Sequence, residues 1–232
     1  MPITTKMRVL LYDTETNGLP KNFRAPPHNT SNWPAILSIA WQLWDIPVPG
    51  TATAEGTAAA AAAARRLEKY ETLVKPDESI VWDAEAEGIH KISRERAMAE
   101  GIAASEAMDA FKTACRRAHL VVAHNLSFDK PVVFAETIRQ NAGTTFEWWP
   151  RMEYCSCEGT KAVCKLPGRR PSVSDPYKLP RLAELYTHLF GSESTVTFHS
   201  AEGDVECLTQ CFHELVRRRL VPLDVWGRFL GE

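Results

Sequence analysis

The chain has 232 residues with 44% hydrophobic content, which is enough to bury a sizeable core, and we expect a single domain over residues 1–232. Lysine and arginine total 27 against 29 acidic residues, so the net charge is −2. This balance excludes a protein that coats nucleic acid by neutralising many phosphates. No segment has the roughly 20 consecutive apolar residues of a membrane span, so we expect no membrane partner.

Six cysteines without a secretory signal predict a reducing, intracellular compartment, either cytoplasm or nucleus, with a processed organellar form left open. Cys155, Cys157 and Cys164 have the spacing Cys-x-Cys-x6-Cys, which lacks a fourth zinc ligand nearby. We therefore favour free thiols over a zinc site at this position. The remaining cysteines lie in helical patterns, where we expect them to pack in the core: Cys115, Cys207 and Cys211.

The first expected strand, residues 8–12, leads directly into two acids one residue apart, Asp13 and Glu15. Successive side chains of a strand alternate between its faces, so these two carboxylates point to one spot while Thr14 points into the opposite layer. An Asn-Gly turn follows. Taken alone, the pair is typical of a solvated strand end, and only the acids found further along make it a candidate metal site.

Two more strands are expected at residues 36–44 and 70–75, as an antiparallel meander closed by Pro76. Residues 47–66 between them are rich in Pro, Gly, Thr and Ala. We expect an insertion there, either a mobile loop or a short surface helix, because the alanine run has no amphipathic face. A helix over residues 105–118 then leads to the fourth strand.

The fourth expected strand, residues 120–123, is followed by His124, Asn125, Phe128 and Asp129. The apolar periodicity of the next residues predicts a helix after Asp129, which places this acid where a strand hands over to a helix. Taken alone, Asp129 is better explained as a helix N-cap. Phe128 can stack on a base or fill the core, and we favour the core.

A short strand near residues 153–157 precedes a second expected insertion, the basic loop 158–177. Guidance of a substrate and plain solvation remain equal alternatives for this loop. Helices are expected at about residues 179–190 and 201–220, and Ser200 is the expected N-cap of the last one.

His199 comes just before this last helix and Asp204 lies within it. Residues five apart on one helix do not share a face, so we expect His199 on the preceding loop, free to move, and Asp204 on the second turn. Each residue alone is also consistent with an ordinary loop histidine or a solvated acid. Arg217–Arg219 are expected to complement the helix dipole. The apolar tail, residues 221–232, either folds back on the domain or docks on a larger assembly.

Four carboxylates and one histidine, in the order Asp-x-Glu, Asp, His-x4-Asp, resemble the DEDDh exonucleases, the DnaQ-like branch of the ribonuclease H-like superfamily. The three blocks are Asp13-Thr14-Glu15, His124-Asn125 with Phe128-Asp129, and His199 with Asp204. The resemblance spans most of the chain. It implies an α/β, ribonuclease H-like three-layer fold, with a mixed five-stranded sheet and helices on both faces.

The resemblance also implies a role for each acid. Asp13 would bridge two divalent cations, Mg²⁺ with Mn²⁺ as a substitute, while Glu15 and Asp204 would hold the ion that activates water and Asp129 would support the second ion through water. Mg²⁺ prefers oxygen ligands, and two ions about 4 Å apart can stabilise both the attacking and the leaving oxygen. His199 would be the general base, since an ordinary histidine pKa of about 6.5 suits removal of a proton from water at neutral pH. Without metal, the acids should repel one another, so we expect either a disordered site or raised carboxylate pKa values.

Further residues resemble the family's substrate side. They share a position next to the carboxylates: Thr14, Gly18, Leu19, His124 and Asn125. Gly18 would allow close backbone approach and Leu19 would wedge against the terminal base. His90 lies in a block that usually reads His-Gly-Ile in the family, but Lys91 replaces the glycine here. A structural histidine is therefore at least as well supported at this position.

Together these features predict a metal-dependent 3′–5′ exonuclease that releases nucleoside monophosphates from single-stranded or frayed 3′ ends of DNA or RNA. DNA proofreading or repair is narrowly ahead of RNA trimming, because contacts to a 2′-hydroxyl are not visible in sequence. The alternative is a structural or docking subunit of a polymerase or ribonucleoprotein assembly with little catalysis. The apolar tail is the feature that would support this alternative.

Overall fold

The computed structural model describes residues 6–48, 64–140, 145–168, 175–196, 198–222 and 224–226. Within these ranges the strands are β1 (Lys6–Thr16), β2 (Ile36–Pro47), β3 (Arg65–Lys75), β4 (Ile102–Ala103), β5 (Leu120–Ala123) and β6 (Met152–Cys155). They form one six-stranded sheet in the order β4-β3-β2-β1-β5-β6. Strands β1, β2 and β3 are an antiparallel meander, while β5 and β6 run parallel to β1.

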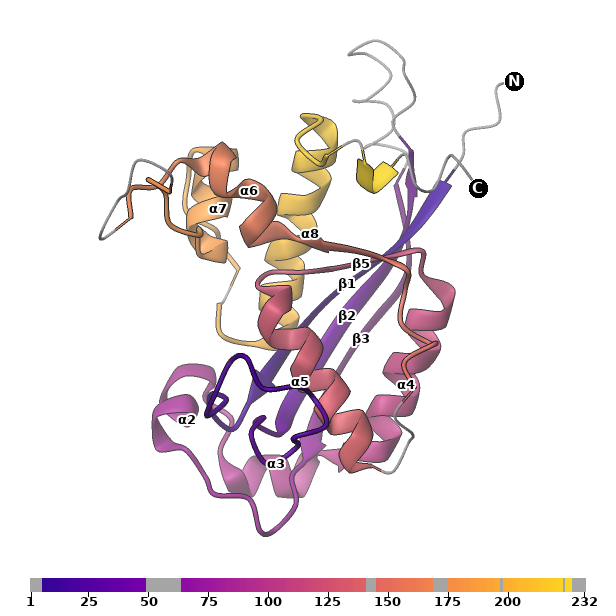
Figure 1. The fold of residues 1–232 in the computed structure, drawn as a ribbon, viewed down its shortest axis with the longest axis vertical. Coiled ribbons are helices and arrows are strands. Elements are labelled where there is room, and N and C mark those ends of the chain that lie inside the picture. The colour runs from indigo at the N-terminus through magenta and orange to yellow at the C-terminus, as the bar shows by residue number, and fades with distance from the viewer. Residues whose placement is uncertain are drawn as a thin grey trace.

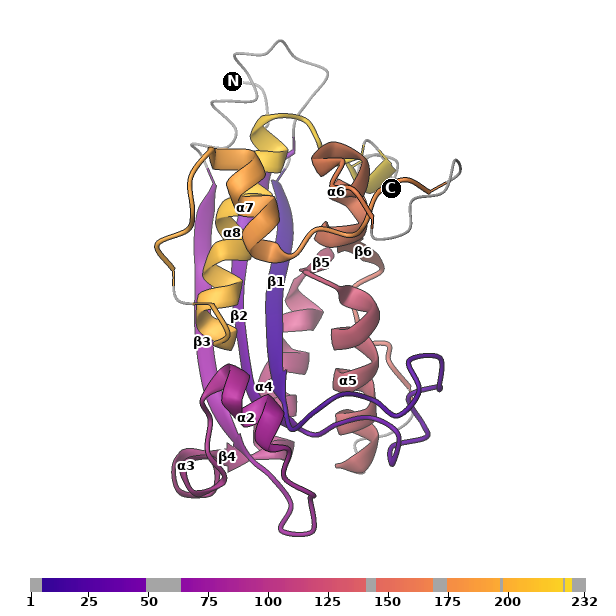
Figure 2. The same cartoon turned by 90° about the vertical axis from the view of Figure 1, so that its left-hand side faces the viewer.

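The helices of the described ranges are α2 (Ala84–His90), α3 (Arg94–Glu100), α4 (Ala104–Arg117), α5 (Leu126–Arg139), α6 (Ser156–Cys164), α7 (Leu182–Phe190) and α8 (Ala201–Arg217). Helices α4 and α5 cover one face of the sheet, and α8 with α7 outside it covers the other (Figures 1 and 2). Helices α2 and α3 lie at the end of the sheet where β1 finishes (Figure 2). The result is a three-layer α/β fold.

The central strand β1 divides its side chains between the two cores. Val9 and Leu11 pack in the core under α7 and α8, whereas Leu10 and Tyr12 pack in the core under α4 and α5. All four side chains are fully buried. A strand buried on both faces needs a continuous apolar sequence, which explains the run that precedes Asp13.

The core under α4 and α5 is rich in aromatic rings. The ring of Phe111, on α4, lies 5.1 Å from that of Tyr12, 5.5 Å from that of Trp41 and 6.4 Å from that of Trp148, measured between centroids. The Phe111 side chain is fully buried. Since these partners come from β1, β2 and the segment after α5, Phe111 links three parts of the chain.

The predicted fold class is confirmed, and the sheet has one strand more than expected. The additional strand is β4, whose two residues pair with the end of β3. Two residues carry no alternating pattern from which a strand could be recognised. Strand β3 also begins at Arg65, five residues before the expected start. This first part of β3 does not pair with β4, so it carries charged side chains that face solvent and that hide the strand in the sequence.

The predicted basic loop 158–177 is wrong in its first part, because α6 occupies Ser156–Cys164. The buried positions of this helix are small or polar residues, so its apolar face is weak in the sequence. Residues 169–174 lie outside the described ranges, as do residues 49–63 of the other predicted insertion. Lys161, on α6, forms an ion pair with Asp175 at 2.5 Å.

Helices α2 and α3 were not predicted, although each has a clear N-cap. The Asp83 carboxylate accepts from the backbone N–H groups of Glu85 and Ala86, and the Ser93 hydroxyl accepts from that of Arg96. Each helix has seven residues and buries only one of them, so a periodic apolar face is absent. The caps rather than the periodicity mark these helices.

The start of the apolar tail folds back on the domain. Val221 and Trp226 are buried in the core under α7 and α8. This part of the tail is therefore not a free docking segment, and residues 227–232 lie outside the described ranges. None of the helices in the described residues is both long and apolar enough to span a membrane.

Truncating Phe111 should cost much of the stability of the domain. We expect Phe111→Ala to lower the free energy of unfolding by about 3–5 kcal/mol, because a cavity replaces a ring that contacts four other aromatic residues. Phe23, which is 57% exposed, is the matched control, and Phe23→Ala should change stability by no more than about 0.5 kcal/mol. Urea denaturation measures both. Equal losses in the two variants would contradict this description of the core.

Candidate metal and catalytic site

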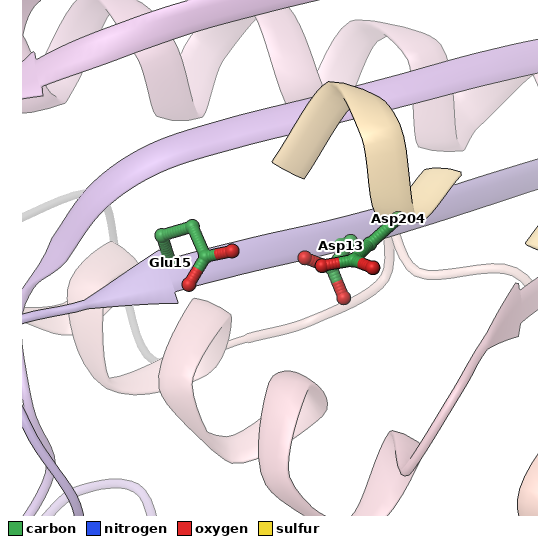
Figure 3. A group of neighbouring side chains, drawn as sticks. All are labelled: Asp13, Glu15 and Asp204. Atoms are coloured by element: carbon green, nitrogen blue, oxygen red, sulfur yellow. The ribbon is translucent and has the colours of Figure 1, made fainter. Parts of the chain in front are cut away.

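Three carboxylates meet at the end of β1. Asp13 and Glu15 project from this strand, and Asp204 projects from the first turn of α8 (Figure 3). One oxygen from each side chain lies within 4.8 Å of the others, and all three residues are half-buried. The carboxylates of Asp13 and Asp204 lie side by side, with Glu15 nearer the end of the strand.

The sequence of β2 explains how α8 comes so close. Ala40 pairs with Asp13 across the antiparallel ladder, and its small side chain packs against Ala201 and Val205 on α8. A larger residue at position 40 would hold the start of α8 away from the sheet. Ser200 caps the helix by accepting from the backbone N–H of Gly203 at 3.1 Å, so the helix begins beside the carboxylates with its positive end toward them.

The electrostatics of the site oppose full ionisation. Burial, followed by repulsion from Asp129, Glu15 and Asp204, raises the pKa of Asp13 well above its usual range. Burial and repulsion from Asp204 and Asp129 raise the pKa of Glu15 to about 8. Burial raises the pKa of Asp204 to about 6, although the backbone N–H of His199 and the charge of its ring oppose the shift. The expected rise of the carboxylate pKa values is thus present.

Asp129 lies beside this group rather than within it. It occupies the first turn of α5, not the residue before the helix as predicted, because the helix already starts at Leu126. Its Oδ1 accepts a hydrogen bond of 2.7 Å from the Thr14 hydroxyl. Burial raises its pKa to about 7, against the opposing effect of the Thr14 bond. Thr14, whose role on the substrate side stays a prediction, therefore holds the fourth acid in place from the opposite face of β1.

His199 lies on the loop before α8, as predicted, and Asp204 is on the first turn rather than the second. The backbone N–H of His199 donates to Asp204 Oδ2 at 3.1 Å, and the residue adopts a left-handed conformation with φ of 65°. Its side chain is exposed. The hydrogen bond holds the loop beside the carboxylate while the ring stays accessible to water.

The segment after β1 is tied to neighbouring loops. The Asn17 side chain accepts from the backbone N–H of Ala35 at 2.7 Å and donates to the Val81 carbonyl at 3.0 Å. Gly18 has φ of 145°, and a Cβ there would lie 3.0 Å from Asp83 Oδ2, so glycine is required by both conformation and space. Leu19 is 74% exposed. Asn17 was not singled out in the sequence, although an Asn between strand and glycine is the signal for such a loop anchor.

A groove of about 1170 Å³ opens beside this segment. Its lining includes Gly18 and Leu19 at one part and Lys21, Lys75 and Arg139 elsewhere. The Arg139 guanidinium is already committed to the carbonyl oxygens of Thr30, Trp33 and Pro34 and to Glu136. Arg139 therefore supports the wall of the groove, and Leu19 and Val81 are exposed apolar side chains in its lining.

His124 has partners within the chain at both ring nitrogens. Nδ1 is 2.9 Å from Ser156 Oγ, and Nε2 is 3.0 Å from the Pro180 carbonyl oxygen, to which it donates. Burial lowers its pKa to about 4, so the ring is neutral. His124 thus joins β5, α6 and the approach to α7, and its contact with substrate stays a prediction. Asn125 is exposed, with φ of 76°, at the start of α5.

His90 and Phe128 take structural places. His90 is buried at the end of α2, its Nδ1 accepts from the backbone N–H of Ile92 at 3.0 Å, and burial lowers its pKa. Phe128 packs against the core under α4 and α5, which agrees with the favoured interpretation. Packing in the fold therefore accounts for both His90 and Phe128.

The three carboxylates suit a hard divalent cation. Their oxygens are the ligand type that Mg²⁺ and Mn²⁺ prefer, and the raised pKa values show that positive charge at this place would be stabilising. Within the described ranges, Cys155, Cys157 and Cys164 do not form a comparable group, which agrees with the expectation of free thiols.

No protein-family model and no curated protein sequence matches this chain. Solved structures of exonuclease I do match its fold. A zinc-bound complex of E. coli exonuclease I with single-stranded DNA gives a TM-score of 0.67 at 16% identity, over 98% of this chain and 43% of that one. The exonuclease I of Methylocaldum szegediense gives 0.63 at 16% identity, over 91% and 41%. The chain therefore has the ribonuclease H-like fold of these enzymes and spans less than half of their length.

Replacing Asp13 by asparagine should stabilise the metal-free protein. A carboxyl group whose pKa is raised by folding holds its proton more tightly in the folded state. The free energy of unfolding therefore falls as the pH rises from the unfolded pKa of about 4 toward the folded pKa. We expect the melting temperature of Asp13→Asn to exceed that of the wild type, by a margin that widens as the pH rises above about 4 toward the folded pKa of Asp13. The substitution also relieves the repulsion that Asp13 exerts on its acidic neighbours, which acts in the same direction.

Calorimetric melting in a chelator measures this margin, and adding Mg²⁺ or Mn²⁺ should raise the melting temperature of the wild type more than that of the variant. The matched control is Asp109→Asn, whose carboxylate on α4 is 74% exposed and pairs with Lys112 at 3.2 Å, outside the carboxylate group; the cation should raise its melting temperature as much as that of the wild type. A constant difference between wild type and Asp13→Asn over this pH range would contradict the proposed repulsion.

Proposed function

We propose that the chain is a metal-dependent 3′–5′ exonuclease that hydrolyses the terminal phosphodiester of single-stranded DNA. The observation that carries this proposal is the convergence of Asp13, Glu15 and Asp204 at the end of β1, with His199 held against Asp204. The fold shared with exonuclease I supports it. Hydrolysis of a phosphodiester requires both a nucleophilic water and neutralisation of the charge that develops on the phosphate oxygens.

Asp13, Glu15 and Asp204 would hold the first divalent cation, and Asp129 would contribute to a second. Bound cations of this kind neutralise phosphate charge and make a nucleophile available at neutral pH. The Thr14 hydroxyl fixes the direction of the Asp129 carboxylate. The start of α8 fixes that of Asp204, because its cap and the backbone N–H of His199 are both engaged.

His199 is the proposed general base. Its backbone is anchored to Asp204, but its exposed ring can reach water in front of the carboxylates. A histidine at this place can take the proton of the attacking water. Among the described residues, no other histidine has an accessible ring beside the three carboxylates. The rings of His90, His124 and His213 are shielded by burial.

The end of the nucleic-acid strand would enter beside the groove at Gly18. Leu19 projects there as an exposed apolar side chain that can pack on a terminal base, and Asn125 is exposed on the side of β5. Single-stranded DNA is the ligand in several of the similar structures, including complexes with dA16 and dT13 oligonucleotides. For this reason we place DNA ahead of RNA as the substrate.

A purified preparation should shorten a 5′-labelled single strand of DNA into a ladder, with Mg²⁺ or Mn²⁺ present and not in chelator. RNA of the same sequence should be degraded more slowly. Asp13→Asn should reduce the rate by at least about 10³-fold, because several kcal/mol of charge stabilisation are lost. Gel electrophoresis of the labelled products measures the direction and the rate.

Asp109→Asn is the matched control for this assay and should retain the wild-type rate. Release of the 5′ label as a mononucleotide, together with a ladder from a 3′-labelled strand, would contradict the polarity. Equal activity of Asp13→Asn and wild type would reject the carboxylate site. An absence of any product with either cation would favour the structural or docking alternative.

His199→Ala should lower the rate by about 10²-fold or more, as the loss of a general base usually does. His188, an exposed histidine on α7, is the matched control, and His188→Ala should leave the rate unchanged. Added imidazole should restore part of the activity of His199→Ala but not that of Asp13→Asn. A near-normal rate in His199→Ala would reject the role of the base.

A further inference from the structure

Two cysteine sulfurs lie in contact at the junction of β6 and α6. The distance between Cys155 Sγ and Cys157 Sγ is 3.4 Å, within the range of a hydrogen bond between two thiols. A disulfide bond needs the sulfurs at about 2.05 Å. The sulfurs are therefore already neighbours, and Cys155 lies outside the helix as its N-cap residue while Cys157 lies in the first turn.

Backbone amides favour the thiolate of Cys155. After the Cys157 thiol, the amides of Glu158, in the first turn of α6, and of Leu126 and Asn125, at the start of α5, lower the pKa of Cys155. Two helix starts thus direct their positive ends at one thiol. Together with the Cys157 thiol, which is the largest cause, these donors lower the pKa of Cys155 to about 6. The same hydrogen bond raises the pKa of Cys157, followed by the effect of burial.

Exposure distinguishes Cys155 from the other cysteines. It is half-buried, whereas the remaining five are buried: Cys115, Cys157, Cys164, Cys207 and Cys211. Reactivity of a thiol toward an oxidant requires both thiolate character and access. Cys155 alone among the six has both, and Cys157 is within reach as a second thiol.

We propose that Cys155 is a peroxide-sensitive thiol that closes a reversible disulfide with Cys157. In the first step the Cys155 thiolate attacks hydrogen peroxide, the O–O bond breaks, and sulfenic acid and water form after uptake of a proton. In the second step the Cys157 sulfur attacks the Cys155 sulfur and releases the oxygen as water. Two thiols and one peroxide give one disulfide and two waters, and a dithiol reductant reverses the reaction.

This site is independent of the proposed nuclease activity, but it borders the same helix start. The charge of Cys155 contributes to the raised pKa of Asp129, which lies in the first turn of α5. Disulfide formation would remove that charge and draw the sulfur away from the amides of Asn125 and Leu126. The oxidation state of the pair is therefore coupled to the electrostatics of α5.

The test uses the full chain, reduced and then treated with equimolar hydrogen peroxide. Remaining thiols are blocked with iodoacetamide, and peptide mass spectrometry locates the oxidised residues. We expect a Cys155–Cys157 disulfide that dithiothreitol removes. Before oxidation, iodoacetamide at about pH 7 should modify Cys155 at least about tenfold faster than the other cysteines.

Three variants distinguish the roles of the sulfurs. Cys157→Ser should stop at a sulfenic acid on Cys155, which dimedone traps, and Cys155→Ser should leave Cys157 unoxidised. Cys164→Ser is the matched control and should still form the disulfide. Full alkylation of Cys155 and Cys157 after peroxide treatment would overturn the proposal, as would oxidation of Cys157 in Cys155→Ser at the rate of the wild type.

Discussion

The alternation of side chains along β1 is the constraint on which the rest of the molecule depends. The face that carries Val9 and Leu11 into the core under α8 carries Asp13 and Glu15 two and four residues later. The opposite face carries Tyr12 into the other core and then Thr14 to Asp129. A shift of one residue in the pairing of β1 would exchange these faces and separate the acids from α8. The same register that fills both cores therefore assembles the site.

The site is assembled against its own electrostatic repulsion. Desolvation raises the pKa values of all four acids, and repulsion from neighbouring carboxylates adds to the shift at Asp13 and Glu15, so the metal-free fold carries ionised groups at a cost in stability. Apolar packing on both faces of β1 offsets this cost, as does the contact of Ala40 with α8. The acids remain close because the strand and the helix start are fixed by burial, not by any attraction among the carboxylates.

The parts of the fold predictable from sequence are those whose periodicity is long or whose chemistry is unusual. Strand β1, the helix carrying Asp204 and the order of the acidic blocks all have such signals. Helices α2 and α3 are held by caps and bury one residue each, and α6 buries polar residues, so none shows an apolar face. The partners of His124 come from positions 32 and 56 residues away, and no local pattern encodes them. Long-range hydrogen bonds of this kind become visible only in three dimensions.

The start of α5 connects the proposed carboxylate site with the proposed thiol pair. After the Cys157 thiol, the amides of its first residues help to lower the pKa of Cys155, and its first turn presents Asp129 toward Thr14. Negative charge on that sulfur disfavours ionisation of Asp129, whereas a cation bound near Asp129 would favour the charged form of both groups. Occupancy of the carboxylate site and the charge of the thiol are consequently linked through one helix terminus. Linked equilibria are reciprocal. If a cation bound near Asp129 favours the Cys155 thiolate, then the thiolate must raise the affinity of the site for that cation.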